Sequence, residues 1–478
     1  MNAGSFSAML HSTDHQILYG RRGTGKTHAL QHLSDLVERT GDVSIYVDLR
    51  TIGSTGGTYA IGDMSASIRG TQLLVDVLET IHDELFAFAL EQADDLLQSL
   101  DALAEAATTV EVVGEVERET TVGDTRQSKF GLELSGGPSA KLTSEDNTST
   151  SAQSRLRRTG IEQLHIVFGP LNRALRAISR ALGTRRLWLL LDEWSSIPLD
   201  LQPLLADLLR RSVLPVSKIT VKIAAIERRC RFSIPTAPGD YVGIELGADA
   251  ATAVSLDDAM VFSDEGKGAQ DFFAQLFYNH SHAMLRRLVD PPCDAAQFIS
   301  EAFRGDAFLE LVRAAEGVPR DAINIAALAA QLAHEDPVEP LHIRRAARDW
   351  YLRDKQAAID SDEEARIILS KLVNEVVGKR RSRTFLLEHT TSAAHQVIDT
   401  LYDARLLHVL RRGIVDREQP GTLYDGFAID YGCYVALMLD GKLQCRPRHR
   451  VGWLNSVHAV PPDGFDFHKE AIDLNTLN

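Results

Sequence analysis

The sequence predicts an α/β protein built on a parallel sheet, followed along the chain by a helical region and a small C-terminal domain. Through the first half of the chain, short apolar segments alternate with amphipathic segments that have the spacing of helices. Alternation of this kind is typical of a parallel sheet covered by helices. The segment 187–191 is apolar at every position, which favours a strand that is buried on both faces.

Length, composition and charge exclude several classes of protein. The chain has 478 residues, 44% of them hydrophobic, which excludes a disordered protein and leaves room for about three domains. Its 51 Lys and Arg against 66 Asp and Glu give a net charge of −15, and this disfavours non-specific coating of nucleic acid. We find no signal-peptide pattern at the start, and the longest strongly apolar run, 187–191, is too short to span a bilayer.

The spacing of the cysteines indicates in which cellular compartment the protein works. The four of them form no C-x-x-C pair and show no zinc-finger spacing with histidine. We therefore expect reduced thiols, and neither a disulfide framework nor a structural zinc. The sequence predicts a cytoplasmic protein with no membrane segment.

The first strand leads into a phosphate-binding motif. The apolar segment 15–19 runs directly into Gly20-Arg-Arg-Gly-Thr-Gly-Lys-Thr27, and helical spacing follows over 26–39. This is the P-loop pattern G-x-x-x-x-G-K-[ST] in its strand–loop–helix context. Its glycines let backbone N–H groups face phosphate oxygens at the positive end of the helix dipole. We expect ATP to contact nine consecutive residues: Gly20, Arg21, Arg22, Gly23, Thr24, Gly25, Lys26, Thr27 and His28.

The second half of the same site is expected where segment 187–191 ends in Asp192 and Glu193. Lys26 would reach the β- and γ-phosphates, while the Thr27 hydroxyl and Asp192 would hold Mg²⁺. Glu193 would orient or deprotonate the attacking water. Two acids after an apolar run are common at plain strand ends, but together with the upstream loop they indicate nucleotide binding and favour hydrolysis.

The rest of the sheet follows from the same alternation. Further strands are predicted at 43–47, 219–226 and 241–246, the last being the final strand of the sheet. The helices between the strands are predicted at 26–39, 70–106, 160–182 and 200–212. Residues 107–158 interrupt this core; alternating apolar and polar positions in 110–117 and 129–137 predict a pair of β-hairpin strands there. Such an insertion is either a contact surface or a tolerated decoration.

Two further segments complete the domain organisation. Residues 267–334 are predicted helical, and Gly317-Val-Pro-Arg320 opens one of the helices. Helices at 362–377, 384–388 and 391–407, followed by strands at 406–410 and 422–429, predict a winged helix-turn-helix. We expect a core at 1–250, a helical lid at 251–357, the winged helix at 358–440 and an irregular tail at 441–478.

The order of P-loop, Gly-x-Pro-Arg in a helical lid, and winged helix resembles the origin-recognition-complex-type AAA+ ATPases and the related STAND signalling ATPases. The resemblance covers about residues 10–440. It implies that Arg320 contacts the γ-phosphate and reports whether ATP or ADP is bound. The strand after Asp192 ends in Glu227 and Arg228 where many AAA+ proteins carry a polar Asn or Thr, so either residue is a candidate for that sensing role. Candidates for an arginine finger that reaches a neighbouring subunit are Arg210, Arg211, Arg228, Arg229 and Arg231.

A winged helix suggests DNA, but the charges here are mixed. The basic residues at 379–383 and 411–412 suit phosphate contacts. The predicted recognition helix 391–407 offers only His395, Arg405 and Gln396 for bases, and it also carries Asp399 and Asp403. Winged helices serve as protein-docking modules as well, so DNA stays the weaker alternative.

Three functions therefore remain open. The first is an ATPase switch that assembles as a homo-oligomer or engages a separate effector protein, for example in bacterial anti-phage defence. The second is a DNA-binding initiator or loader for replication or transposition. The third is a regulator in which nucleotide binding matters and hydrolysis is incidental.

Overall fold

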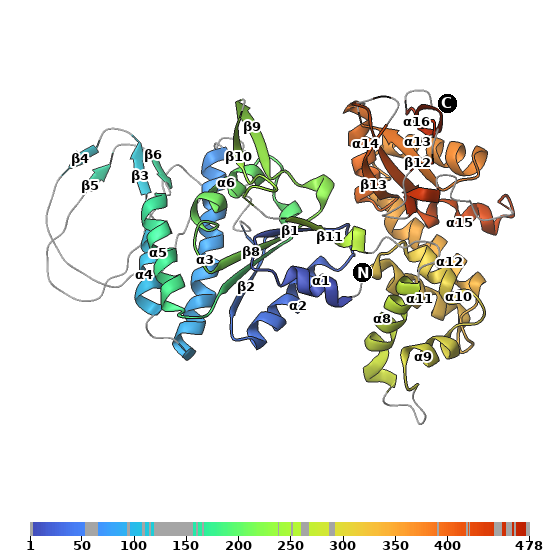
Figure 1. Ribbon diagram of the computed structural model, residues 1–478, viewed down its shortest axis with the longest axis horizontal. Coiled ribbons are helices and arrows are strands. Elements are labelled where there is room, and N and C mark those ends of the chain that lie inside the picture. Colours follow the sequence, from blue (N-terminus) through green and yellow to red (C-terminus); the bar gives the residue numbers. More distant parts are fainter. Residues whose placement is uncertain are drawn as a thin grey trace.

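The computed structural model describes most of the chain. The described residues are 3–52, 66–92, 96–107, 110–113, 116–118, 156–158, 161–164, 167–237, 239–249, 252–259, 267–285, 292–389, 392–416, 419, 421–443, 452–455, 461–462 and 465–474. We refer to residues 3–259 as the N-terminal half and to residues 267–474 as the C-terminal half; Figure 1 shows the two side by side. Within the described ranges, no helix is both long and apolar enough to cross a membrane.

A five-stranded parallel sheet forms the centre of the N-terminal half. Its order is β11-β1-β8-β7-β2. The strands are β1 (Gln16–Tyr19), β2 (Val43–Asp48), β7 (Leu187–Asp192), β8 (Ile219–Ala225) and β11 (Thr252–Ser255). Each neighbouring pair runs parallel, as the alternation in the sequence predicts.

Helices cover both faces of this sheet, which makes a three-layer core (Figure 1). Strand β7 illustrates why, because its alternate side chains enter different cores: Leu189 and Leu191 pack on one face, Trp188 and Leu190 on the other. On the first face lie α3 (Ala66–Gln92) and α6 (Gln202–Ser212), and α4 (Leu97–Ala107) and α5 (Phe168–Ala181) pack outside these two helices in the same apolar cluster. The second face is covered by α1 (Ala3–Leu10) and α2 (Lys26–Arg39).

Several predicted elements of this half need correction. Residues 70–106 are two helices, α3 and α4, and the helix predicted over 160–182 begins only at Phe168 because Ile161–Leu164 is a strand, β6. The segment 241–246 is not the last strand of the sheet. Residues Asp240–Gly243 form β10, which pairs with β9 (Ser233–Ala237) in an antiparallel hairpin, and β11 takes the edge position instead.

The described strands of the insertion pair with one another across it. Strand β3 (Val110–Val113) pairs with β6, and β4 (Val116–Arg118) pairs with β5 (Leu156–Arg158). The predicted partner strand at 129–137 lies outside the described residues.

The first part of the C-terminal half is helical. After the short α7 (Leu256–Ala259) come α8 (Lys267–Leu285), α9 (Ala295–Ala302), α10 (Ala307–Ala315), α11 (Pro319–Ala333) and α12 (Pro340–Trp350). A π-helical segment, η5 (Tyr351–Gln356), and a 3-10 turn, η6 (Ala357–Ile359), continue α12 towards the next part of the chain.

The second part packs helices on a three-stranded antiparallel sheet of order β12-β14-β13. Its elements are α13 (Glu363–Leu372) with its π-helical extension η7 (Val373–Lys379), β12 (Thr384–Glu388), α14 (Ser392–Asp403), β13 (Leu407–Val415), β14 (Leu423–Ile429) and α15 (Tyr431–Leu439). The short helix predicted at 384–388 is wrong, because this segment is β12 and pairs along its length with β14. Five residues are too few for a helical period to be distinguished from a buried strand.

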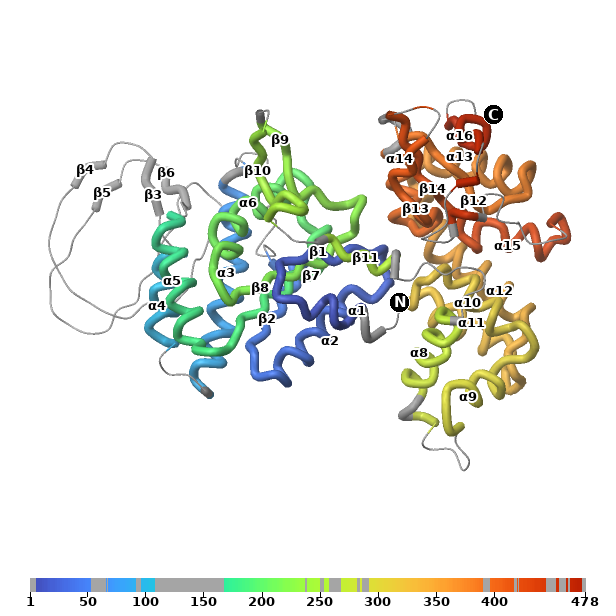
Figure 2. Tube along the Cα trace, in the orientation of Figure 1, coloured from blue at the N-terminus to red at the C-terminus, as the bar shows by residue number. Residues whose placement is uncertain are grey.

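The tail packs on this sheet. Leu454, in η8 (Gly452–Asn455), and Phe467, in α16 (Phe467–Glu470), join Tyr424 of β14 in one buried cluster. The two turns thus cover a sheet face that would otherwise be exposed. Figure 2 follows the chain in the same orientation, with this red C-terminal end next to the orange strands.

Candidate functional site

The segment 20–25 forms the loop between β1 and α2, and Lys26 and Thr27 begin α2, as the pattern predicts. Gly23 and Gly25 have φ angles of 83° and 97°, values that favour glycine because a Cβ atom would be strained there. Gly25 precedes α2, which begins at Lys26 and continues through Thr27 and His28. The N-terminus of the 14-residue helix α2 therefore points into the space that the loop encloses.

Lys26 is buried in this loop. Its Nζ donates to the carbonyl oxygens of Gly20 at 2.8 Å and Arg21 at 3.1 Å. Burial lowers the pKa of Lys26, while the nearby carboxylates of Glu193, Asp257 and Asp192 act in the opposite direction. Among the described residues, this ammonium group has neutral carbonyls as its hydrogen-bond partners, which suits it to receive an anion.

Asp192 lies at the end of β7 and is fully buried. Its carboxylate accepts from the Tyr46 hydroxyl at 2.7 Å and from the backbone N–H of Glu193 at 2.8 Å. Tyr46 comes from β2, next to β7 in the sheet, and no sequence motif marks it. Burial and the bond to Asp192 raise the pKa of Tyr46, so this phenol stays a donor that fixes the carboxylate.

Glu193 follows in a left-handed backbone conformation, with φ at 57°. Such a conformation is strained for a non-glycine residue and turns the side chain away from the continuing strand direction. The Glu193 carboxylate is partly exposed and lies 3.9 Å from the guanidinium of Arg50. Asp192 and Glu193 are thus held differently, one buried and fixed, the other accessible.

Arg320 is brought against the P-loop although the two are far apart in the sequence. Its backbone N–H donates to the Gly23 carbonyl at 3.3 Å, and a Cβ on Gly23 would lie 2.8 Å from the Cβ of Arg320. The Arg320 guanidinium is 46% exposed and forms an ion pair with Asp354 at 3.5 Å. The N-terminus of α11 is therefore in direct contact with the loop.

Arg21 is the residue whose role sequence patterns missed. Predicted to contact nucleotide, it is buried and joins both halves of the molecule. Its backbone N–H and its Nε donate to the two carboxylate oxygens of Asp257 at 3.0 and 2.8 Å. Its remaining nitrogens contact the Glu316 carbonyl, at 3.2 Å, and the Nδ1 of His408 on β13.

His408 continues this contact into the C-terminal half. Its Nε2 lies 2.8 Å from Asp430, whose other carboxylate oxygen accepts from the Gly432 N–H at the start of α15. Burial, and then the charge of Arg21, lower the pKa of His408. The imidazole is thus held neutral between a cation and an anion.

Four of the five candidate finger arginines form ion pairs within the chain. Arg228 contacts Asp399 and Arg229 lies 3.3 Å from Asp403, both on α14. Arg210 and Arg211 form ion pairs with Asp207 of their own helix, at 2.6 and 2.7 Å. The Arg231 side chain is exposed, and its backbone N–H donates to Gln202 at 2.7 Å.

Most of the basic residues that were predicted to contact DNA form ion pairs with acidic residues of this chain. The guanidinium of Arg383 is held by Glu316, at 2.9 Å for one of its two bonds. Arg412 pairs with Glu227 of the N-terminal half, and Lys379 pairs with Glu375 at 2.9 Å. Arg405 is buried against Asp321 and Asp354.

The strand order, the loop after β1 and the buried aspartate at the end of β7 define an α/β fold of the P-loop nucleoside-triphosphatase class. No family model and no curated protein matches the chain. Among solved structures it is similar to RuvB of Thermotoga maritima in two mutant forms, each at 10% identity and a TM-score of 0.33, covering 91% of this chain and 90% of RuvB. A third mutant form gives 13% identity and a TM-score of 0.25, over 56% of this chain and 83% of RuvB. Similarity this weak does not extend to activity or partners.

Proposed function

We propose that this chain is an ATP-binding and ATP-hydrolysing switch of the AAA+ or STAND type. One observation carries the proposal: the buried ammonium of Lys26, at the N-terminus of α2, has neutral loop carbonyls as its hydrogen-bond partners among the described residues. A phosphate would supply the missing anion at the positive end of the helix dipole.

The residues around Lys26 suit Mg²⁺ and water activation. Hard cations such as Mg²⁺ prefer oxygen ligands, and the Thr27 hydroxyl with the Asp192 carboxylate would provide them. When bound, Mg²⁺ would neutralise charge on the phosphates. Tyr46 fixes Asp192 through its hydroxyl. Glu193, partly exposed beside Asp192, would accept a proton from water, and Arg320, next to Gly23, would contact the γ-phosphate.

Nucleotide binding and phosphate release test this proposal. Lys26→Ala removes the phosphate-binding ammonium and should abolish ATP binding. Glu193→Gln keeps the shape of the side chain and removes the base, so it should bind ATP while turnover falls about 10²- to 10⁴-fold. Unchanged turnover in Glu193→Gln would show that another group activates the water, and wild-type protein that does not bind ATP would refute the proposal as a whole.

The switch would act through assembly or through an effector protein. Solution mass with no nucleotide, with ADP and with a non-hydrolysable ATP analogue tests the first case, with Lys26→Ala as control. Assembly only with the analogue, lost in the variant, would support an ATP-built homo-oligomer, with a defence effector as one candidate partner. A monomer in all three states would favour a switch that needs a separate partner. If nucleotide changes the assembly state and Glu193→Gln shows the same change as the wild type, a regulator that depends on nucleotide binding and not on hydrolysis is favoured.

A DNA-binding loader is the second candidate, because Lys379, at the end of η7, and Arg381, two residues after it, are exposed basic residues. The acidic residues of α14 and the internal pairing of Arg383 and Arg412 weigh against it. Salt-dependent duplex binding that is lost when 379–383 are neutralised would favour it. Absence of binding at low salt would exclude it.

A further inference from the structure

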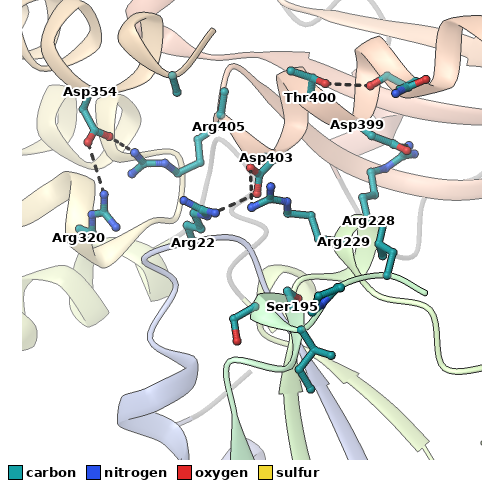
Figure 3. A pocket seen from close by; sticks show the side chains of 17 residues that line it. Arg22, Ser195, Arg228, Arg229, Arg320, Asp354, Asp399, Thr400, Asp403 and Arg405 are labelled. Carbon is teal, nitrogen blue, oxygen red and sulfur yellow. Dashed lines mark hydrogen bonds and ion pairs between the residues drawn. The ribbon is translucent and has the colours of Figure 1, made fainter. Parts of the chain in front are cut away.

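A cavity of about 700 Å³ lies where the two halves meet beside the P-loop. Figure 3 shows its side chains coming from the P-loop, from the segments after β7 and β8, from α11 and η5, and from α14. Its wall holds five arginines and three aspartates: Arg22, Arg228, Arg229, Arg320, Arg405, Asp354, Asp399 and Asp403. Cationic groups thus outnumber anionic ones in a cavity that adjoins the candidate phosphate site.

Asp403 of α14 lies between two of these arginines, from different parts of the N-terminal half (Figure 3). Its Oδ1 is 3.5 Å from the Nε of Arg22 in the P-loop, and its Oδ2 is 3.3 Å from a terminal nitrogen of Arg229 in η4 (Glu227–Arg229). Charge-assisted bonds between nitrogen and a carboxylate are normally about 2.7–2.9 Å. One carboxylate therefore contacts two guanidinium groups, and both contacts are longer than a normal charge-assisted bond.

The polar groups of this cavity are incompletely satisfied. The Oδ1 of Asp403 and the Nε atoms of Arg228 and Arg405 are buried and have no hydrogen-bond partner among the described residues. Arg405 itself is 96% buried, since its exposed fraction is 4%. Buried polar atoms are normally bonded, so these unsatisfied atoms indicate that the side chains of the cavity are not optimally paired with one another. A phosphate group is larger than a carboxylate and offers three acceptor oxygens in different directions.

We propose that this cavity is a polyphosphate subsite and that Asp403 fills it as an internal anion when no phosphate is bound. The inference rests on the proposed function, since it extends the nucleotide site from Lys26 towards Arg22 and Arg229. Asp403 and the terminal phosphate of a nucleotide compete for these two arginines. Because α14 carries Asp403, binding of polyphosphate weakens the docking of α14, and by linkage the docking of α14 weakens the binding of polyphosphate.

Competition makes a specific prediction for Asp403→Asn, which keeps the size of the side chain and removes its charge. Exposed or partly exposed ion pairs each contribute little, so losing two of them should tighten binding of inorganic tripolyphosphate roughly three- to tenfold. The matched control is Asp440→Asn, which makes the same change of net charge at a site 56% exposed and outside the cavity. Calorimetric titration of both variants and the wild type measures the effect.

The outcomes separate this inference from the proposed function. Tighter binding in Asp403→Asn alone supports the competition. Equal affinity in all three proteins, an equal gain in both variants, or no binding in any of them overturns it. Wild-type protein that binds ATP while Asp403→Asn gains nothing refutes the subsite and leaves the ATPase proposal standing.

Hydrogen exchange provides a readout in the unmodified protein. Tripolyphosphate should accelerate amide exchange over 392–403, because it displaces the carboxylate that holds α14, and Arg229→Gln should reduce this response. Slower exchange of α14 with the ligand would mean that phosphate and α14 bind together, which contradicts the competition.

Discussion

Lys355 is a buried cation of the C-terminal half, and replacing it with Met should destabilise that half. Its Nζ lies 2.9 Å from Asp321 of α11 and 2.6 Å from Asp430 at the start of α15, and its side chain is 2% exposed. Burial would lower the pKa of Lys355, but the two carboxylates outweigh it and raise that pKa. The lysine is therefore charged throughout the physiological range and neutralises two buried anions.

The expected cost follows from what remains after the change. Removing one partner of a buried ion pair typically costs about 3–5 kcal/mol, because a charge is left uncompensated. Asp321 would keep Arg405 and the Trp350 indole, and Asp430 would keep His408 and the Gly432 N–H. We therefore expect the lower end of that range, about 3 kcal/mol.

Native-state hydrogen exchange of amides in α11 and α15 measures this loss directly, since a chain of several domains need not unfold in one step. The control is Lys442→Met, which removes a lysine that is 69% exposed and pairs with Asp440 at 3.3 Å; it should cost less than about 1 kcal/mol. A loss in Lys355→Met as small as in the control would refute the view that this lysine compensates two buried charges.

Three further changes test other contacts. The pKa of His408 is lowered in the native state, so below about pH 6.5 the unfolded chain takes up a proton that the native state resists. The free energy of unfolding should therefore decrease as the pH decreases, by up to about 1.4 kcal/mol per pH unit. In His408→Gln, urea midpoints should depend less on pH. Gly23→Ala should destabilise the nucleotide-free protein more than Gly25→Ala, because both have positive φ but only at Gly23 would the new Cβ meet Arg320; equal midpoints would argue against a tight contact between loop and α11. Leu454→Ala, at a side chain 1% exposed against Gly426, should cost about 2–5 kcal/mol in urea unfolding, and a loss near zero would mean that the tail is not part of the core.

The sequence was most informative where the fold is determined locally. The P-loop, its strand and its helix lie within 24 consecutive residues, Gln16–Arg39, and the residue types that such a loop requires are visible in the pattern. Strand β7 was equally clear, because five apolar residues before Asp192 leave few alternatives. Both predictions depended only on neighbours in the sequence.

The errors arose where distant partners decide the structure. Residues Thr384–Glu388 are a strand because β14 pairs with them, and Asp240–Gly243 leave the sheet because Ser233–Ala237 offer a closer antiparallel partner. Arg21 makes a contact that sequence patterns did not reveal, since the histidine that contacts it is 387 residues away; its predicted nucleotide contact stays a prediction. Its position within a phosphate-binding motif predicted a ligand contact, and nothing nearby in the sequence indicates Asp257 or His408.

The division of the hydrophobic core has a consequence for how the chain is made. Among the described residues, the two clusters that line the parallel sheet end at Leu256, and the two clusters of the C-terminal half begin at Ala269. During synthesis, the N-terminal half can therefore bury its own apolar surface before the second half leaves the ribosome. The side chains that await later partners, such as Arg21 and Arg228, are charged. The half-made protein would thus present charged side chains such as Arg228 at this junction, and surface charge favours solubility while the remaining residues are added.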